Sequence, residues 1–160
     1  MPAEPHRFRE VMGHFATGVA VVTCDGSDGP SGLTTSAVCS LSLDPVLLLV
    51  CLDETSRTLP ALAAAGRFAV NLLREGQEPL AATFASKVLM REKFEAVTHT
   101  VADGVPVLDD ALAWLACELR ELLPRGDHTI AIGEVTALDA DPGGRPLLYH
   151  RGSFTGLHYG

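Results

Sequence analysis

The sequence predicts a mainly β protein, an antiparallel Greek-key-like barrel with about three short helices. Short runs rich in Val, Leu, Ile and Thr recur about every 8–12 residues with turn-forming residues between them, which is typical of barrels. Helical patterns are few, whereas a parallel α/β sheet needs a helix after nearly every strand. At 160 residues, the chain is expected to form a single domain, residues 1–160.

The first element expected is a short N-terminal helix. Four apolar residues follow the i, i+3, i+4, i+7 spacing of one helix face, namely Phe8, Val11, Met12 and Phe15. Gly18 is expected to end this helix. An apolar β run should then cover residues 19–24, and the sequence Asp-Gly-Ser-Asp-Gly-Pro at 25–30 is typical of a turn.

The middle of the chain should alternate strands with two further helices. Strands are expected at residues 32–43, 46–52 and 68–73. The first of the two helices is predicted to have Thr55 or Ser56 as its N-cap and to stop at Gly66. The second covers about residues 79–86.

The second half of the chain is mostly β. Residues 115–120 alternate between apolar and charged side chains, which is the period-two pattern of a half-buried strand. Further strands are expected at residues 130–138 and 147–151, with the turn Asp-Pro-Gly-Gly at 141–144 between them.

Charge and hydropathy exclude several classes of protein. The net charge of −8 and pI of about 5.1 argue against nucleic-acid binding, which rests on cationic contacts to phosphates. The longest apolar run, Val46–Leu52, is far shorter than the ~20 residues that span a bilayer, and the polar N-terminus has no signal segment behind it. We therefore expect a soluble, cytoplasmic protein. The mean hydropathy of +0.21 favours a surface buried against a partner, most simply in a homodimer.

The cysteines agree with a reducing compartment. No C-x-x-C pair occurs, and the surroundings of the four cysteines are apolar or small: Cys24, Cys39, Cys51 and Cys117. Buried free cysteines act as small hydrophobic residues, so structural roles are expected. Cys39 lies beside a candidate ligand loop and could touch a ligand without reacting.

Common chemical motifs are missing from the sequence. There is no dinucleotide or phosphate-loop glycine pattern and no nucleophile elbow. Asp139 and Asp141 begin like a calcium loop, but His150 stands where the bidentate Glu would be. The six histidines follow no metal-binding spacing, so no metal is expected.

Two hydroxyl-rich segments remain as candidate ligand contacts, residues 33–45 and 53–58. Each lies at the end of an apolar strand. Hydroxyls and N–H groups at a helix start can bind phosphate without net positive charge, so the segments suit a ligand with an aromatic body and an anionic tail. The alternative is an ordinary Thr-rich strand facing solvent, with Ser56 only a helix cap.

A series of motifs runs from about residue 8 to the C-terminus. They stand at residues 15–23 (Phe-Ala-Thr-Gly-Val-Ala-Val-Val-Thr), 32–45 (Gly-Leu-Thr-Thr-Ser-Ala-Val-Cys-Ser-Leu-Ser-Leu-Asp-Pro), 68–72, 84–85, 93–94, 126–130, 133–135 and 147–152. Each is weak alone. In their order and spacing, together they resemble the flavin reductase-like family, which has the FMN-binding split barrel fold.

This resemblance implies a split-barrel homodimer that reduces FMN or FAD by hydride transfer from NADH or NADPH and supplies a separate monooxygenase component. It implies isoalloxazine contacts from Leu33, Thr34, Thr35, Ser36, Ala37, Val38 and Ser40. It implies ribityl and phosphate contacts from Cys51, Leu52, Asp53, Ser56, Arg57 and Thr58, with Phe84, Ala85 and Ser86 closing the phosphate end. His128 takes the catalytic position, where it would orient flavin or nicotinamide by hydrogen bonding.

Two departures from the family pattern stand out. Val46 follows Pro45 where family members often have a second proline, and residues 88–92 are less polar than expected. The second departure leaves Lys87 and Arg91 open as phosphate ligands.

Other assignments stay open at this level. His128 could be an ordinary loop histidine, and His150 a residue of a subunit-contact strand. Trp114 is expected in the core or at the dimer interface. As alternatives to an enzyme, the same barrel could be a flavin-binding or sensor module, or a structural dimer with a vestigial pocket.

Overall fold

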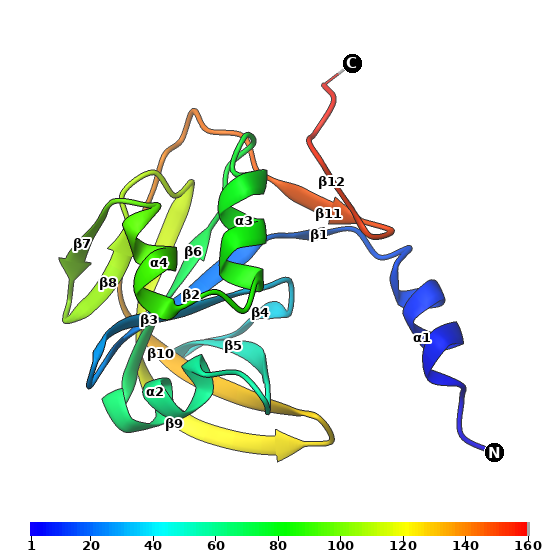
Figure 1. Cartoon of the computed structure of the whole chain (residues 1–160), viewed down its shortest axis with the longest axis horizontal. Helices are drawn as coiled ribbons and strands as arrows, with labels where there is room; N and C mark the ends of the chain where they lie inside the picture. Colours follow the sequence, from blue (N-terminus) through cyan, green and yellow to red (C-terminus); the bar gives the residue numbers. More distant parts are fainter. Residues whose placement is uncertain (160) are drawn as a thin grey trace.

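The computed structural model describes residues 1–159 and is built around one curled antiparallel sheet (Figure 1). Its strands, in spatial order, are β3 (Gly29–Thr35), β2 (Ala20–Gly26), β6 (Arg67–Leu72), β9 (Ala113–Arg125), β10 (His128–Ala140), β5 (Val46–Asp53) and β4 (Val38–Leu43). Smaller sheets join β1 (Thr17–Gly18) to β11 (Leu148–His150) and β12 (Ser153–Thr155), and β7 (His99–Ala102) to β8 (Val105–Leu108).

The two edge strands, β3 and β4, are consecutive in the chain, and only Ser36 and Ala37 lie between them. Six strand spacings of about 4.8 Å make a flat sheet about 29 Å wide, whereas this link reaches about 10 Å. The sheet must therefore curl. Thr35 Oγ1 donates to the Cys51 carbonyl (3.3 Å) and Cys51 N donates to the Ala37 carbonyl (3.0 Å) at the point of closure.

A close contact in the barrel interior depends on a glycine. Phe68 is fully buried, and a Cβ added to Gly133 would lie 2.6 Å from the Phe68 ring and 2.7 Å from Cys117 Cβ. The motif that begins at Gly133 therefore serves packing, because only glycine lets β10 pass this close to the aromatic ring.

The β8 segment is tied to the sheet by the buried side chain of Asn71. Its Nδ2 donates to the Val21 carbonyl (2.9 Å) and to Thr23 Oγ1 (3.0 Å), and its Oδ1 accepts from Leu108 N (2.8 Å). Because every polar atom of the amide has a partner, Asn71 is stable at zero exposure. The asparagine of the 68–72 motif therefore has a structural role.

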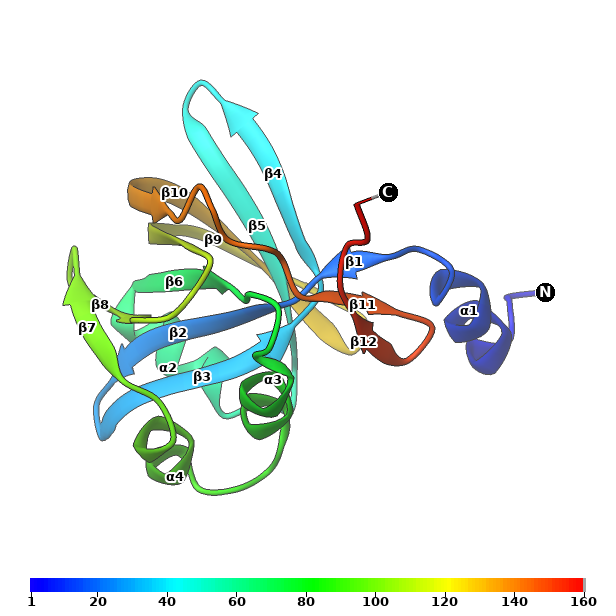
Figure 2. The ribbon, with the colours of Figure 1, turned by 90° about the horizontal axis from the view of Figure 1, so that it is seen from above.

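Four helices accompany the sheet: α1 (Pro5–Met12), α2 (Thr58–Ala65), α3 (Glu78–Ala85) and α4 (Met90–Glu95). Three cover the barrel, with α3 and α4 lying along β3 (Figure 2). By contrast, α1 projects from the body and buries none of its residues (Figure 2). Phe8 is 60% exposed and Phe15 69%.

Several predicted boundaries are wrong. The first helix ends at Met12 rather than at Gly18, which lies in β1, because nothing within residues 1–159 buries the apolar face of α1. The strand predicted at residues 32–43 is two strands, since Thr35 Oγ1 accepts from Ala37 N (3.0 Å) and forms a local turn. The sequence patterns also missed α4 and the β7–β8 hairpin.

Local hydrogen bonding and backbone conformation set the two ends of α2. Arg57 occupies the N-cap position of α2, yet the Ser56 hydroxyl accepts from Leu59 N (3.2 Å) and satisfies a first-turn donor. Gly66 ends the helix with φ +69°, which is the left-handed conformation that glycine adopts at low cost. The predicted stop at Gly66 is confirmed.

Candidate functional site

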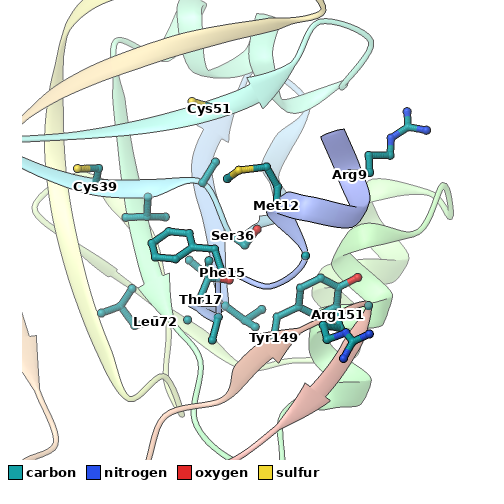
Figure 3. Close-up of a pocket in the computed structure, with 18 of the residues that line it drawn as sticks. Arg9, Met12, Phe15, Thr17, Ser36, Cys39, Cys51, Leu72, Tyr149 and Arg151 are labelled. Atoms are coloured by element: carbon teal, nitrogen blue, oxygen red, sulfur yellow. The ribbon is translucent and has the colours of Figure 1, made fainter. Parts of the chain in front are cut away.

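Two cavities meet at the point where the barrel closes. The first, called here the polar cavity, has a volume of about 680 Å³ and lies between the ends of β3 and β5, the start of α2 and the end of α3. The second, the apolar cavity, has a volume of about 920 Å³ and lies between α1, β1, β4 and the β11–β12 turn (Figure 3). Cys51 lines both cavities, and burial raises the pKa of its thiol.

Most of the predicted site residues come together in the polar cavity. Its lining includes Leu33, Thr34, Thr35, Cys51, Asp53, Ser56, Arg57, Thr58, Phe84, Ala85, Ser86 and His128. The apolar cavity takes three others, Ser36, Ala37 and Val38. Ser40 and Leu52 line neither cavity, because Ser40 is exposed on β4 and the Leu52 side chain is fully buried in the core.

Besides His128, the polar cavity is lined by three basic side chains, of which Lys93 is the most buried at 3% exposure. Its Nζ donates to the Phe84 carbonyl in the last turn of α3 (2.8 Å). Burial and, to a smaller extent, the Arg57 guanidinium lower the pKa of Lys93. Arg57 donates to the Val88 carbonyl (2.7 Å), and Lys87 is the third basic residue.

Lys93 stands in the 93–94 motif, but the sequence-based assignments missed its place in the site. Only the packing of α4 against β3 brings it there. Lys87 lines the polar cavity, whereas Arg91 lines neither cavity.

The hydroxyls at the start of α2 differ in what they can contact. Thr58 is 1% exposed and its Oγ1 lies 3.1 Å from Ser31 Oγ, so this hydroxyl already has a protein partner. Ser56 is half-buried and remains accessible from the cavity. Of the two predicted hydroxyls, Ser56 is therefore better placed to bind a ligand.

Asp53 and His128 stand opposite each other in the β5–β10 ladder. Hydrogen bonds from the Thr55 hydroxyl (2.6 Å) and backbone N–H (2.7 Å) lower the pKa of Asp53, with smaller contributions from the positive charges of His128 and Lys87. His128 Nδ1 lies 2.7 Å from Asp127 Oδ1. This hydrogen bond lowers the pKa of Asp127, and because an ionised carboxylate only accepts, Nδ1 carries the hydrogen.

The apolar cavity has aromatic and aliphatic walls, among them Phe8, Met12, Phe15 and Tyr149. Figure 3 shows Phe15, Met12 and Ser36 near its centre. The Thr17 hydroxyl, on β1 at this cavity, is buried and has no hydrogen-bond partner within residues 1–159. The combined site offers a wide apolar surface beside a basic, hydroxyl-lined compartment.

Within residues 1–159, no three His, Cys, Asp or Glu side chains gather in a way that could hold a metal ion. None of the helices in that range has the length and apolar character needed to cross a bilayer.

Comparison with known proteins identifies the family. Residues 12–158 match the family model described as "Flavin reductase like domain". The chain is 47% identical over 150 residues to a flavin reductase (NADH) of Kitasatospora aureofaciens, covering 92% of this chain and 78% of that protein. It is 37% identical over 157 residues to the reductase subunit HsaB of a flavin-dependent monooxygenase from Mycobacterium tuberculosis, covering 96% and 83%.

A solved structure agrees with these relatives. The NADH:FAD oxidoreductase of Streptomyces globisporus, determined with NAD and FAD fragments, superimposes with a TM-score of 0.90 at 34% identity and covers 99% of this chain and 97% of that one. A relative from Rhizobium meliloti is 42% identical over 153 residues, and there the chain spans about half, 48%, of the longer protein.

The fold and the comparisons define a split-barrel oxidoreductase. The chain belongs to the flavin reductase-like family. The predicted family, fold class and enzyme class are confirmed, and so is the predicted cofactor class of flavin and nicotinamide nucleotide.

The residues present fit a flavin nucleotide. A Cβ added to Gly32 would lie 2.9 Å from the Phe84 ring, so only glycine lets β3 pack this close to Phe84, and both residues line the polar cavity. The basic residues suit a phosphate, and the apolar cavity suits an aromatic ring. Cys51, at the junction, lies where the two parts of such a ligand would join.

Proposed function

We propose that this chain reduces free FMN or FAD with NADH or NADPH, and that the flavin lies across the junction of the two cavities. The observation that carries the proposal is that a cationic, hydroxyl-lined cavity and an apolar cavity share Cys51. Bound flavin would accept a hydride from the reduced nicotinamide.

The chain's own residues bind and orient in this proposal. Lys93, Arg57 and the Ser56 hydroxyl hold the phosphate, and Asp53 accepts hydrogen bonds from ribityl hydroxyls. The segment 36–38 supports the ring from the apolar side. His128, oriented by Asp127, positions the nicotinamide and is not required to transfer a proton. Ser40 and Leu52 contribute at most through backbone atoms, since their side chains face neither cavity.

We further propose that the protein is a homodimer in the cytoplasm, binds neither membrane nor nucleic acid, and delivers reduced flavin to a separate oxygenase. Apolar residues left exposed on α1 and at the β4–β5 turn support the dimer, with Leu43 at 90% exposure. The monooxygenase reductase subunit among the relatives supports the oxygenase partner.

The test is steady-state oxidation of NADH and NADPH with FMN, FAD and riboflavin in turn, together with light scattering at micromolar concentration. We expect flavin-dependent turnover by a dimer. His128→Ala should lower kcat/KM for the nicotinamide about 5- to 150-fold, the effect of one lost positioning contact, with flavin affinity changed less. His128→Asn keeps a donor and should recover part of the activity.

Two outcomes would contradict the proposal. A protein that binds flavin but oxidises neither nucleotide would be a binding or sensor module. A fully active monomer would refute the dimer.

A further inference from the structure

Two exposed arginines stand on one side of the apolar cavity. Arg9 comes from α1 and Arg151 from the β11–β12 turn, and Figure 3 shows both across the cavity from Cys39 and Leu72. Both are exposed, and within residues 1–159 neither guanidinium makes a hydrogen bond or ion pair. By contrast, carboxylates pair with Arg67, Arg74, Arg120 and Arg145.

The backbone ties these two arginines together. Gly13 N donates to the Arg9 carbonyl (2.9 Å), and Arg151 N donates to the Gly13 carbonyl (2.9 Å). One residue thus connects the last turn of α1 to the β11–β12 turn, although the two segments lie more than a hundred residues apart in the chain. The two side chains start from neighbouring backbone on the same side of the cavity, and in Figure 3 the Arg9 guanidinium is directed outward.

The presence of arginine at position 151 is not explained by the turn that it occupies. His150 pairs with Ser153, so Arg151 and Gly152 form a two-residue hairpin loop, with φ +50° and +79°. Asn, Asp or Gly suits the first position of such a turn, whereas arginine there carries backbone strain. A strained residue of this kind at a cavity is a reason to look for a function of its side chain.

We propose that Arg9 and Arg151 bind the phosphate groups of the nicotinamide dinucleotide that delivers the hydride, an inference that rests on the proposed function. Guanidinium groups bind phosphate bidentately, so two of them on one side of a cavity suit a pyrophosphate. The flavin phosphate has its own cations on the other side of Cys51. Salt screens charges beyond about 8 Å and no Asp or Glu within residues 1–159 is among those that line the apolar cavity, so the net charge of −8 does not exclude an anion here.

The decisive comparison is between two hydride donors. NADH carries the pyrophosphate, whereas 1-benzyl-1,4-dihydronicotinamide has the same reactive ring without phosphate. Arg9→Gln and Arg151→Gln should each raise KM for NADH about 3- to 30-fold, as for a charge-assisted hydrogen bond weakened by exposure to solvent, and leave KM for the benzyl donor unchanged.

The control variant is Arg7→Gln. Arg7 lies on the same helix, pairs with Glu10 and lines neither cavity, so both KM values should stay at wild-type levels. As a readout without turnover, calorimetric titration of the flavin-free protein with NAD⁺ should show weaker binding in the two cavity variants and a smaller dependence on salt.

Arg151→Asn separates this role from folding. Asparagine suits the turn, so the variant should be at least as thermally stable as the wild type while its KM for NADH rises. Equal changes for both donors would overturn the inference. A loss of FMN affinity without loss of riboflavin affinity would also overturn it. So would dissociation of the dimer while the ratio of the KM values for the two donors stays unchanged.

Failure of the proposed function gives a different result. If the wild-type protein oxidises neither donor with any flavin, the proposed function is wrong. If it oxidises both donors and the arginine variants leave the ratio of the two KM values unchanged, only the phosphate role of Arg9 and Arg151 is wrong.

Discussion

Replacing Lys93 by methionine tests the assignment of the polar cavity to the flavin phosphate. Methionine keeps an unbranched stem and removes the ammonium group of a residue that is only 3% exposed. A buried ammonium is poorly screened, so its bond to phosphate should contribute about 1.5–3 kcal/mol. The dissociation constant for FMN should therefore rise about 10- to 150-fold.

The same change has a cost to folding that must be measured separately. The Phe84 carbonyl loses its donor, which costs about 1–3 kcal/mol, but the desolvation that lowers the pKa of Lys93 is relieved. We expect a modest fall in Tm, recorded by calorimetry without flavin. Lys87→Met is the matched control, because Lys87 is exposed and should change FMN affinity by only a few fold, within about 1 kcal/mol.

Riboflavin makes the assay specific, because it lacks the phosphate. Fluorescence titration of Lys93→Met should give nearly wild-type affinity for riboflavin and a large loss for FMN. Equal losses for the two flavins would mean that Lys93 only supports the fold. Unchanged FMN affinity would put the phosphate outside the polar cavity.

Three further predictions concern the barrel, its thiols and its acid response. Gly133→Ala should destabilise the protein by about 1–3 kcal/mol or more in chemical denaturation because its Cβ would overlap the Phe68 ring, whereas Gly143→Ala, with nothing nearer than 3.6 Å, should have little effect. With a chromogenic disulfide reagent, exposed Cys39 should react in the native protein. Burial raises the pKa of two thiols to about 12, and these should react only after unfolding: Cys24 and Cys117. The fold lowers the pKa of Asp53, so the ionised carboxylate should stabilise the protein fully at pH values above the ordinary pKa of 3.8. This stabilisation should be lost as the pH falls below that value. The difference in Tm between wild type and Asp53→Asn should therefore shrink only in that acid range.

The local elements could be read from the sequence where short-range chemistry decides them. Gly66 ends α2 by adopting a left-handed conformation, and residues 141–144 form the predicted turn, with Gly144 N donating to the Asp141 carbonyl (3.2 Å). The length of α1 could not be read in the same way. Its apolar face follows helical spacing, yet nothing within residues 1–159 buries it, so the helix stops at Met12.

Motif order identified the family, and most of the residues assigned by position do gather in one cavity. Leu52 is an exception because of its side-chain direction, since it lies on a strand whose alternate residues face the core. Thr58 does line the cavity, but its hydroxyl is already paired with Ser31. No local pattern reports which face of a strand a cavity adjoins.

The sequence by itself determined the strand-rich architecture, the turns and the set of chemical groups, because these depend on spacing and residue type over a few positions. Only the tertiary structure decided that Lys93 enters the polar cavity, that Cys51 lies at the junction of two cavities, and that Arg9 and Arg151 share one side of the second. These juxtapositions join segments far apart in the chain. They follow from the curling of the sheet and the packing of α4 and the β11–β12 turn, which no local pattern encodes.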